Sequence, residues 1–267
     1  MEGNFWLAFS LTIIAGLSTT IGSAVVLFTK QFSKRFLAAS LGFSAGVMIF
    51  ISLVELYGDA KESLVTLFGS GKGDFVALLS FFGGIALIAV IDYLVPSGEN
   101  PHEPGEISIR SEGSQVSKEK MMRLGLMSAL AIGIHNFPEG IATFVTAMSD
   151  PNLGLSIAVA VGIHNIPEGI AVAIPIYYAT RSKGKAFFHS TLSGLAEPIG
   201  ALVGYFLLSF LFDDSFMGII LAGVAGIMVY ISLDELLPTA EKYGEHHPAI
   251  LGVIGGMAVM GVSLLFL

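Results

Sequence analysis

The chain has 267 residues, of which 54% are hydrophobic and 13% are charged, and its mean hydropathy is +0.79. Soluble domains carry about 25% charged residues, so this composition indicates an integral membrane protein and excludes one or two soluble domains. The net charge of −8 comes without a basic tract, which argues against a nucleic-acid partner. The sequence contains no cysteine, so disulfides and thiolate metal sites are excluded.

Eight apolar stretches approach the roughly 20 residues that a helix needs to cross a bilayer. We therefore predict an all-α membrane protein in which residues 1–267 form one transmembrane domain. The expected spans are about 5–29, 36–57, 75–95, 123–148, 152–180, 185–212, 215–238 and 248–267. The stretch 5–29 lacks a basic n-region and a cleavage site, which predicts a retained span. Residues 96–122 are rich in Gly, Pro, Ser and Glu, which predicts a mobile linker.

Lys and Arg concentrate on one side of the expected spans. Of the thirteen Lys and Arg, all but Lys61 and Lys72 fall in the loops after the first, third, fifth and seventh spans. Basic loop residues favour the cytoplasm, so we predict a multi-pass cell-membrane protein with both termini outside and 96–122 inside. The segment GSGKGD at 69–74 lacks the Ser or Thr and the strand of a phosphate loop, so we interpret it as an outer turn.

The sequence contains two internal repeats. Residues 133–142 (GIHNFPEGIA) and 162–171 (GIHNIPEGIA) match at nine of ten positions. Residues 41–56 and 221–236 match at nine of sixteen positions, at an offset of 180. In each pair the two copies cross the membrane in opposite directions. Inverted repeats are typical of transporters that bind substrate near the membrane midplane. We therefore predict a 3+2+3 arrangement with the fourth and fifth spans as the central pair.

Seven polar residues lie near the middle of the fourth, fifth and sixth spans. They are His135, Asn136, Glu139, His164, Asn165, Glu168 and Glu197. A charge at this depth costs about 2.5–3.5 kcal/mol on insertion scales, and no Lys or Arg is placed to compensate the glutamates. Protons or bound cations remain as the compensating charges. On a helix, a His four residues before Glu and an Asn three residues before it flank that Glu on opposite edges. Two such faces predict adjoining cation sites that share carboxylates.

The residue types of this cluster indicate which metals it would take. Imidazole, carboxylate and amide ligands without sulfur suit Zn²⁺, Fe²⁺, Mn²⁺ or Co²⁺ and disfavour Cu⁺. Pro138 and Pro167 each deprive a carbonyl of its helical partner, and such irregular backbone is tolerated in a membrane where it lines a polar cavity. We therefore predict a metal pathway, in which the divalent cations are transported substrates and no cofactor is needed.

The doubled HNxPEG motif, GLAEPIG at 194–200 and the ISLxEL pair together resemble the ZIP family of divalent-metal transporters, in its short-loop bacterial branch. The resemblance covers nearly the whole chain. It implies eight helices, outward termini and uptake of zinc and related metals into the cytoplasm. It also implies a two-metal site. One half would consist of Glu139, His164 and Glu168 with His135 nearby, and the other of Asn136, Glu139, Asn165, Glu168 and Glu197. The oligomeric state stays open, a homodimer included.

Further acidic and histidine residues lie near the span ends. Glu55 and Asp59 close the second span at its outer end, where they could attract cations or form a solvated helix end. Asp92, His189, Asp234 and Glu235 lie towards inner ends, where they could form an exit or act as caps and hydrogen-bond partners.

Two other functions compete with metal transport. A proton-coupled carrier could use the glutamates as a proton relay, although a relay does not need an amide beside each histidine. An intramembrane metallohydrolase would need an HExxH pairing, whereas here the Glu follows each His by four residues. We therefore expect no enzymatic activity.

Overall fold

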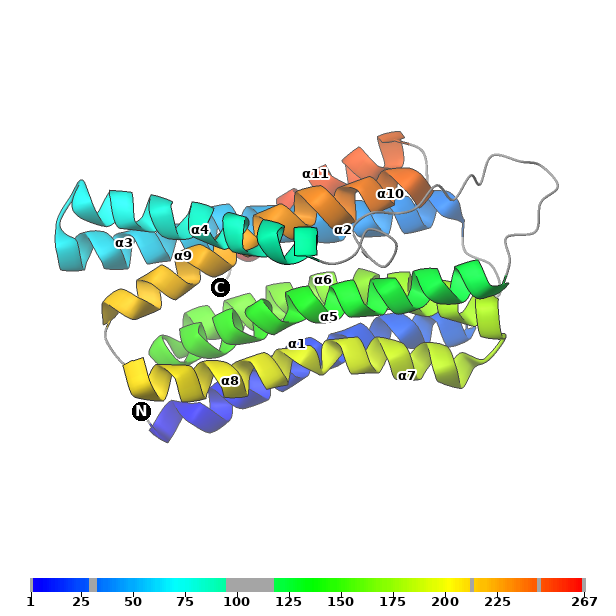
Figure 1. Ribbon diagram of the computed structural model, residues 1–267, viewed down its shortest axis with the longest axis horizontal. Helices are drawn as coiled ribbons and strands as arrows, with labels where there is room; N and C mark the ends of the chain where they lie inside the picture. The colour runs from blue at the N-terminus through cyan, green and yellow to red at the C-terminus, as the bar shows by residue number, and fades with distance from the viewer. Residues whose placement is uncertain (1, 29–32, 95–117, 212–213, 244–245, 266–267) are drawn as a thin grey trace.

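The computed structural model describes residues 2–28, 33–94, 118–211, 214–243 and 246–265, and the regular structure of these residues is helical (Figure 1). Most of the expected linker 96–122 lies outside the described residues. The α-helices are α1 (Glu2–Phe28), α2 (Lys34–Ile51), α3 (Tyr57–Phe68), α4 (Lys72–Leu94), α5 (Lys118–Ser149), α6 (Pro151–Thr180), α7 (Lys183–Gly194), α8 (Ala196–Leu211), α9 (Asp214–Ile231), α10 (Leu237–Tyr243) and α11 (His246–Ser263).

Two long rods each contain one π-helical turn. The turn η1 (Ser52–Leu56) joins α2 to α3, and η2 (Ser232–Leu236) joins α9 to α10. The two turns stand 180 residues apart, within the ISLVEL and ISLDEL segments of the sequence repeat. In each, a backbone N–H donates to the carbonyl five residues before it, from Tyr57 to Ser52 in the first copy. The sequence repeat is therefore also a repeat of local structure.

Six helical segments of the described chain are long and apolar enough to cross a membrane. They are Asn4–Ala24, Arg35–Phe68, Lys72–Tyr93, Pro151–Thr180, Met217–Glu241 and His246–Ser263. The other two expected spans, 123–148 and 185–212, fall on α5 and on α7 with α8. Polar residues in its middle lower the hydropathy of α5, and α7 and α8 have only 12 and 16 residues because the helix is interrupted between them. The count of eight spans stays a prediction.

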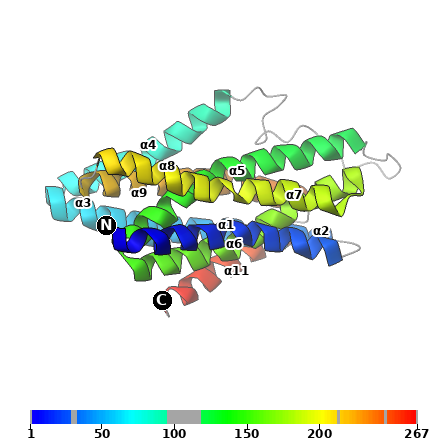
Figure 2. The same cartoon turned by 90° about the horizontal axis from the view of Figure 1, so that it is seen from below.

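The helices pack in two groups, which Figures 1 and 2 show from two sides. In one group α6 packs on α1 and α5, and α5 packs on α8. In the other group α2 packs along α11, and α4 along α9. A shift of 180 residues carries α2 onto α9 and α4 approximately onto α11, so the two pairs of the second group are one contact made twice. The contact of α2 with α6 joins the groups.

Glycines bring the helices of the second group close together. A Cβ atom added at Gly46 would lie 2.1 Å from the carbonyl oxygen of Val253, and one at Gly226 would lie 2.0 Å from that of Phe81. Small residues at such contacts let helix backbones approach within a membrane, where packing replaces the hydrophobic effect as the driving force. At these glycines, α2 and α9 therefore pack directly against the backbone of their partner helices.

We expect Gly46→Ala to lower the stability of the protein, because its new methyl group must displace the backbone of α11. Overpacking of this kind costs about 1–3 kcal/mol. The measurement is the melting temperature of the purified protein in detergent. Gly83→Ala is the control, since nothing lies within 4 Å of a Cβ atom at Gly83. Equal melting temperatures for the two variants would contradict the packing argument.

The helix α6 has well-defined ends, which fix its register against its neighbours. Its N-cap is Asp150, whose side chain accepts hydrogen bonds from the backbone N–H groups of Asn152 and Leu153, and Pro151 occupies the first turn. Its last turn is closed by Arg181 in the left-handed conformation, with φ of 55°. The tight turn that follows leads directly into α7, capped by Ser182.

Candidate metal centre

The central helices α5 and α6 bury most of the residues predicted for the metal site. Asn136 and Glu139 on α5, and His164, Asn165 and Glu168 on α6, are all 0% exposed. Glu197, in the first turn of α8, is also 0% exposed. His135 belongs to α5, but its side chain lies outside the described part of the structure. Burial of this many carboxylates and amides requires partners for their polar atoms.

Glu139 and His164 connect the two central helices. His164 Nε2 lies 3.2 Å from Glu139 Oε1, and both side chains are fully buried. The second carboxylate oxygen, Glu139 Oε2, is buried without a hydrogen-bond partner among the described residues. Imidazole nitrogen and carboxylate oxygen are also ligands for divalent transition metals. A cation between these side chains would satisfy the oxygen for which the described residues provide no partner.

The two asparagines donate hydrogen bonds to backbone carbonyls of neighbouring helices. Asn136 Nδ2 donates to the Ser193 carbonyl at 3.3 Å, and Asn165 Nδ2 donates to the Ala15 carbonyl at 3.1 Å and to Glu197 Oε1. Because each amide nitrogen is used in this way, each amide oxygen points elsewhere. Asn136 Oδ1 and Asn165 Oδ1 are buried and make no hydrogen bond to the described residues. These oxygens are therefore oriented as acceptors for a cation or a water molecule.

Ser44 on α2 connects the second group of helices to the site. Its single hydroxyl hydrogen can be donated to Glu168 Oε1 at 3.1 Å or to the carbonyl oxygen of His164 at 3.3 Å. Sequence reasoning did not single out Ser44. The available signal was its place in the 180-residue repeat, where the apolar Val224 occupies the corresponding position. Where one copy of the repeat has a buried polar residue and the other an apolar one, the polar residue is expected to have a specific hydrogen-bond partner.

The break between α7 and α8 explains the position of Glu197. Pro198 has no backbone N–H, so the carbonyl of Gly194 loses its helical partner and the helix is interrupted at Leu195. A helix begins again with Ala196, which places Glu197 in its first turn. The dipole of a helix N-terminus favours a carboxylate there, although the hydrogen bonds from Leu195 to Thr191 and from Ile199 to Leu195 still span the interruption. The interruption thus helps to hold a negative charge in the interior.

The structure brings the predicted site residues together as pairs of side chains. These pairs are Glu139 with His164, Asn165 with Glu197, and Glu168 with Ser44. Within the ranges that the structure describes, no three His, Asp or Glu side chains are grouped closely enough to hold a metal ion. The side chain of His135 is not part of that comparison. The two-metal arrangement expected from the sequence therefore stays a prediction.

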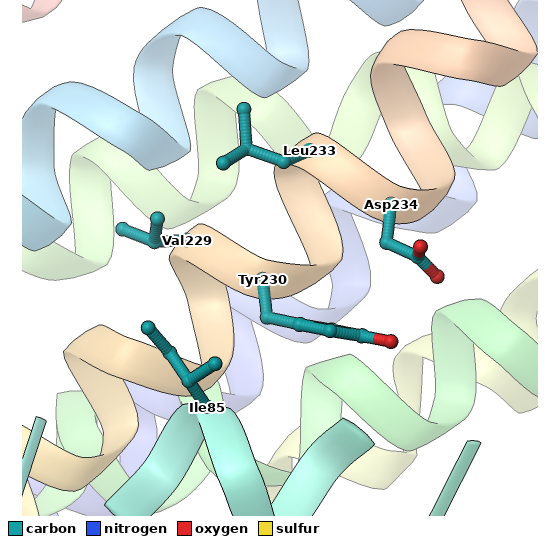
Figure 3. A pocket seen from close by; sticks show the side chains of 5 residues that line it. All are labelled: Ile85, Val229, Tyr230, Leu233 and Asp234. Atoms are coloured by element: carbon teal, nitrogen blue, oxygen red, sulfur yellow. The ribbon is translucent and has the colours of Figure 1, made fainter. Parts of the chain in front are cut away.

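Of the residues expected near an inner exit, Asp92 lies on α4, Asp234 and Glu235 lie in η2, and His189 lies apart from them on α7. The Tyr230 hydroxyl donates to Asp92 Oδ2 at 3.5 Å, a weak contact between α9 and α4. Beside it is a hollow of about 220 Å³ lined by Ile85, Val229, Tyr230, Leu233 and Asp234 (Figure 3). Figure 3 shows the polar ends of Tyr230 and Asp234 on one side of the rod, away from the apolar residues of the lining. Glu235, in η2, is 8% exposed. An exit role for these groups stays a prediction.

Long apolar helices surround buried carboxylates, imidazole and amides in this structure. This combination is typical of membrane transport proteins. The sequence profile of the ZIP zinc transporter family matches residues 96–264. The zinc transporter ZupT of Chlorobium chlorochromatii is 60% identical over 99% of both chains. Those of Clostridium perfringens and Lysinibacillus sphaericus are 56% and 55% identical, over 98% and 100% of this chain and 96% and 100% of their own. The chain belongs to the ZIP family.

Membership confirms the resemblance seen in the HNxPEG, GLAEPIG and ISLxEL segments. The protein is a multi-pass protein of the cell membrane, and its family consists of transporters rather than enzymes.

Proposed function

We propose that this protein imports zinc across the cell membrane into the cytoplasm through the interface of α5 and α6. The observation that carries the proposal is the fully buried pair of Glu139 and His164, beside which Glu139 Oε2 makes no hydrogen bond to the described part of the chain. The relatives named zinc transporter ZupT support zinc as the substrate. In a bilayer interior, such ionisable groups are expensive and are typical of a transport pathway.

The proposed centre has two halves that share carboxylates. Glu139, His164 and Glu168, with His135, form the half that contains imidazole, and the asparagine half consists of oxygen ligands from Asn136, Glu139, Asn165, Glu168 and Glu197. An arriving cation would exchange its water for Glu139 and His164, which separate from each other to bind it. To bind the ion through Nε2, His164 must first lose the proton that it donates to Glu139, by release to water or by a shift to Nδ1. This exchange replaces one electrostatic contact with another, so it limits the cost of stripping water from the ion. Iron, manganese and cobalt are further substrates of the same ligand set.

We further propose that residues 1–267 form one domain of eight spans in a 3+2+3 arrangement of inverted repeats. The paired π-helical turns and the two equivalent contacts, α2 with α11 and α9 with α4, support the repeats. The rods α5 and α7–α8 would add two spans to the six described helical segments that are long and apolar enough to cross a membrane. The distribution of Lys and Arg supports outward termini.

The experiment that tests the proposed function is uptake of divalent metals into proteoliposomes that contain the purified protein. We expect zinc to accumulate, and Fe²⁺, Mn²⁺ and Co²⁺ to compete with it, without any organic substrate. The same measurement with and without a pH gradient tests the alternative of a proton-coupled carrier. Proton movement through the protein in the absence of any metal, together with no metal uptake, would replace the proposal by that alternative.

A labelling experiment tests the proposed orientation. Cysteines introduced at Ser70 and Ser215 are expected to react with a membrane-impermeant thiol reagent in intact cells, whereas one at Ser114 reacts only after permeabilisation. The chain has no cysteine of its own, so each label reports one position. The reverse pattern would show that the termini face the cytoplasm.

A further inference from the structure

The contacts of α5 with α7 and α8 repeat those of α6 with α1. Asn165 stands 29 positions after Asn136, and Ser193 stands 178 positions after Ala15. The Asn136 amide donates to the Ser193 carbonyl at 3.3 Å, and the Asn165 amide donates to the Ala15 carbonyl at 3.1 Å. A shift of 29 positions forward for the asparagine and of 178 positions back for the carbonyl therefore converts the first hydrogen bond into the second.

The same two shifts relate the close approaches of these helices. A Cβ atom at Gly140 would lie 2.0 Å from the carbonyl oxygen of Glu197, and one at Gly169 would lie 1.9 Å from that of Thr19. The segments GLSTTIG at 16–22 and GLAEPIG at 194–200 carry the repeat and share four of seven residues. A second pair of close approaches is related by the same shifts. A Cβ atom at Gly200 would lie 2.1 Å from the carbonyl oxygen of Phe137, and one at Gly22 would lie 1.9 Å from that of Ile166.

Thr19 is therefore the counterpart of Glu197. The Cβ atoms of the two residues occupy equivalent positions, since a Cβ added at Gly194 would lie 3.0 Å from that of Thr19, and one at Gly16 would lie 3.3 Å from that of Glu197. The two copies of the repeat thus differ at this position: Glu197 provides a carboxylate, and Thr19 provides a neutral hydroxyl.

Thr19 is 0% exposed, and its hydroxyl has no hydrogen-bond partner among the described residues. The shifts that convert Glu197 into Thr19 also convert Asn165 into Asn136. Because the Asn165 amide contacts Glu197, the same shifts predict that the side chain of Thr19 faces Asn136, whose amide oxygen is likewise buried and unbonded within the described residues. Threonine is two bonds shorter than glutamate, so we expect its hydroxyl to stop short of Asn136 Oδ1. A buried hydroxyl and a buried amide oxygen that do not reach each other need a bridging water or cation.

We propose that Thr19 Oγ1 and Asn136 Oδ1 form a neutral oxygen position that binds a hydrated divalent cation during transport. The proposal deepens the proposed function and rests on it. Neutral oxygens hold an ion more weakly than Glu197 does, so the ion can leave this side more readily. A position without nitrogen or sulfur favours Mn²⁺ over Zn²⁺ in relative terms. Thr19 therefore contributes to selectivity on the asparagine side of the centre.

Calorimetric titration of the purified full-length protein with Mn²⁺ and with Zn²⁺ tests the proposal. Thr19→Val keeps the shape of the side chain and removes the hydroxyl. We expect it to weaken Mn²⁺ binding about three- to tenfold, the loss of roughly one hydrogen-bond-strength contact, and to weaken Zn²⁺ binding less. Thr19→Ser should bind as the wild type does. Thr19→Glu, with the residue of its counterpart, should bind both ions more tightly.

The matched control is Thr12→Val on the same helix, because the hydroxyl of Thr12 is equally buried but donates to the Ala8 carbonyl at 3.0 Å. The metal-free Thr19→Val protein should melt no lower than the wild type, since it loses only an unbonded hydroxyl. Unchanged Mn²⁺ binding by Thr19→Val, or by Thr19→Glu where the valine variant does not fold, would overturn the proposal. A lower melting temperature with unchanged binding would assign a structural role to Thr19 instead.

Uptake of zinc by the wild type and by Thr12→Val is measured in parallel in proteoliposomes. If neither protein carries zinc, the proposed function fails. The binding comparison still decides the role of Thr19, because it does not depend on transport.

Discussion

Replacing Glu139 or Glu168 with alanine is expected to abolish uptake of every metal, a loss of about a hundredfold or more. Each carboxylate lies between the imidazole edge and the amide edge of its helix, so each removal takes a ligand from both halves of the centre. Losing even the residues that orient ligands typically costs 10- to 100-fold in metal affinity or activity, and losing a shared ligand should cost more. Folding should survive, because removing a buried charge eases membrane insertion.

The measurement is initial uptake of zinc and iron into proteoliposomes that contain equal amounts of protein. Protein that elutes as a single species in detergent shows that each variant is folded. Glu62→Ala is the control, since Glu62 is an exposed glutamate on α3 and lies outside the centre. Uptake at the wild-type rate by Glu139→Ala or Glu168→Ala would refute shared carboxylates.

The positions of the helices could be predicted because apolar length and capping residues are local signals. The expected span 152–180 coincides with α6, where Asp150 and Pro151 form the start, and 215–238 falls on α9, η2 and α10. The second rod is longer than expected. It continues to Phe68, because α3 is an amphipathic helix whose charged face includes Lys61, and Lys61 forms an ion pair with Asp74 at 3.2 Å. An amphipathic helix such as α3 has a low mean hydropathy, so mean hydropathy alone does not distinguish it from a loop.

The interruption at Leu195 could not be placed from hydropathy, because the residues on both sides of it are apolar. Pro198 removes one backbone donor, but this local change does not by itself decide whether a helix is interrupted. Pro138 and Pro167 have the same effect on their donors, yet α5 and α6 continue as helices. The different outcome depends on how neighbouring helices support each backbone, and this information lies outside any local pattern.

The residues of the candidate centre could be predicted from their spacing, but their partners could not. Spacing along one helix places Glu139 and Glu168 on polar faces. The contacts with Ser44, and with the carbonyls of Ala15 and Ser193, join residues more than fifty positions apart in sequence. Such contacts depend on the packing of α1, α2 and α7 around the central pair, which the sequence does not specify by any periodic signal.

The two halves of the proposed centre are expected to differ in metal preference. His164 contributes the imidazole of one half, and Glu197 contributes a carboxylate that accepts the amide of Asn165 in the other. Imidazole favours Zn²⁺, whereas oxygen ligands favour Fe²⁺ and Mn²⁺ in relative terms. His164→Ala should therefore reduce zinc uptake more than iron uptake, and Glu197→Gln should reduce iron and manganese uptake more than zinc uptake. A relative shift of about tenfold corresponds to about 1.4 kcal/mol of differential binding.

Competitive uptake of zinc and iron by both variants measures this difference, with the same protein amounts and ion concentrations. His247→Ala serves as the imidazole control, because His247 is exposed in the first turn of α11 and lies outside the proposed centre. The shift in metal preference should be partial, because Glu139 and Glu168 belong to both halves. Altering either half therefore also weakens metal binding in the other half. If both variants lose zinc and iron in equal proportion, the two halves are not chemically distinct, and the carboxylates alone hold the ion.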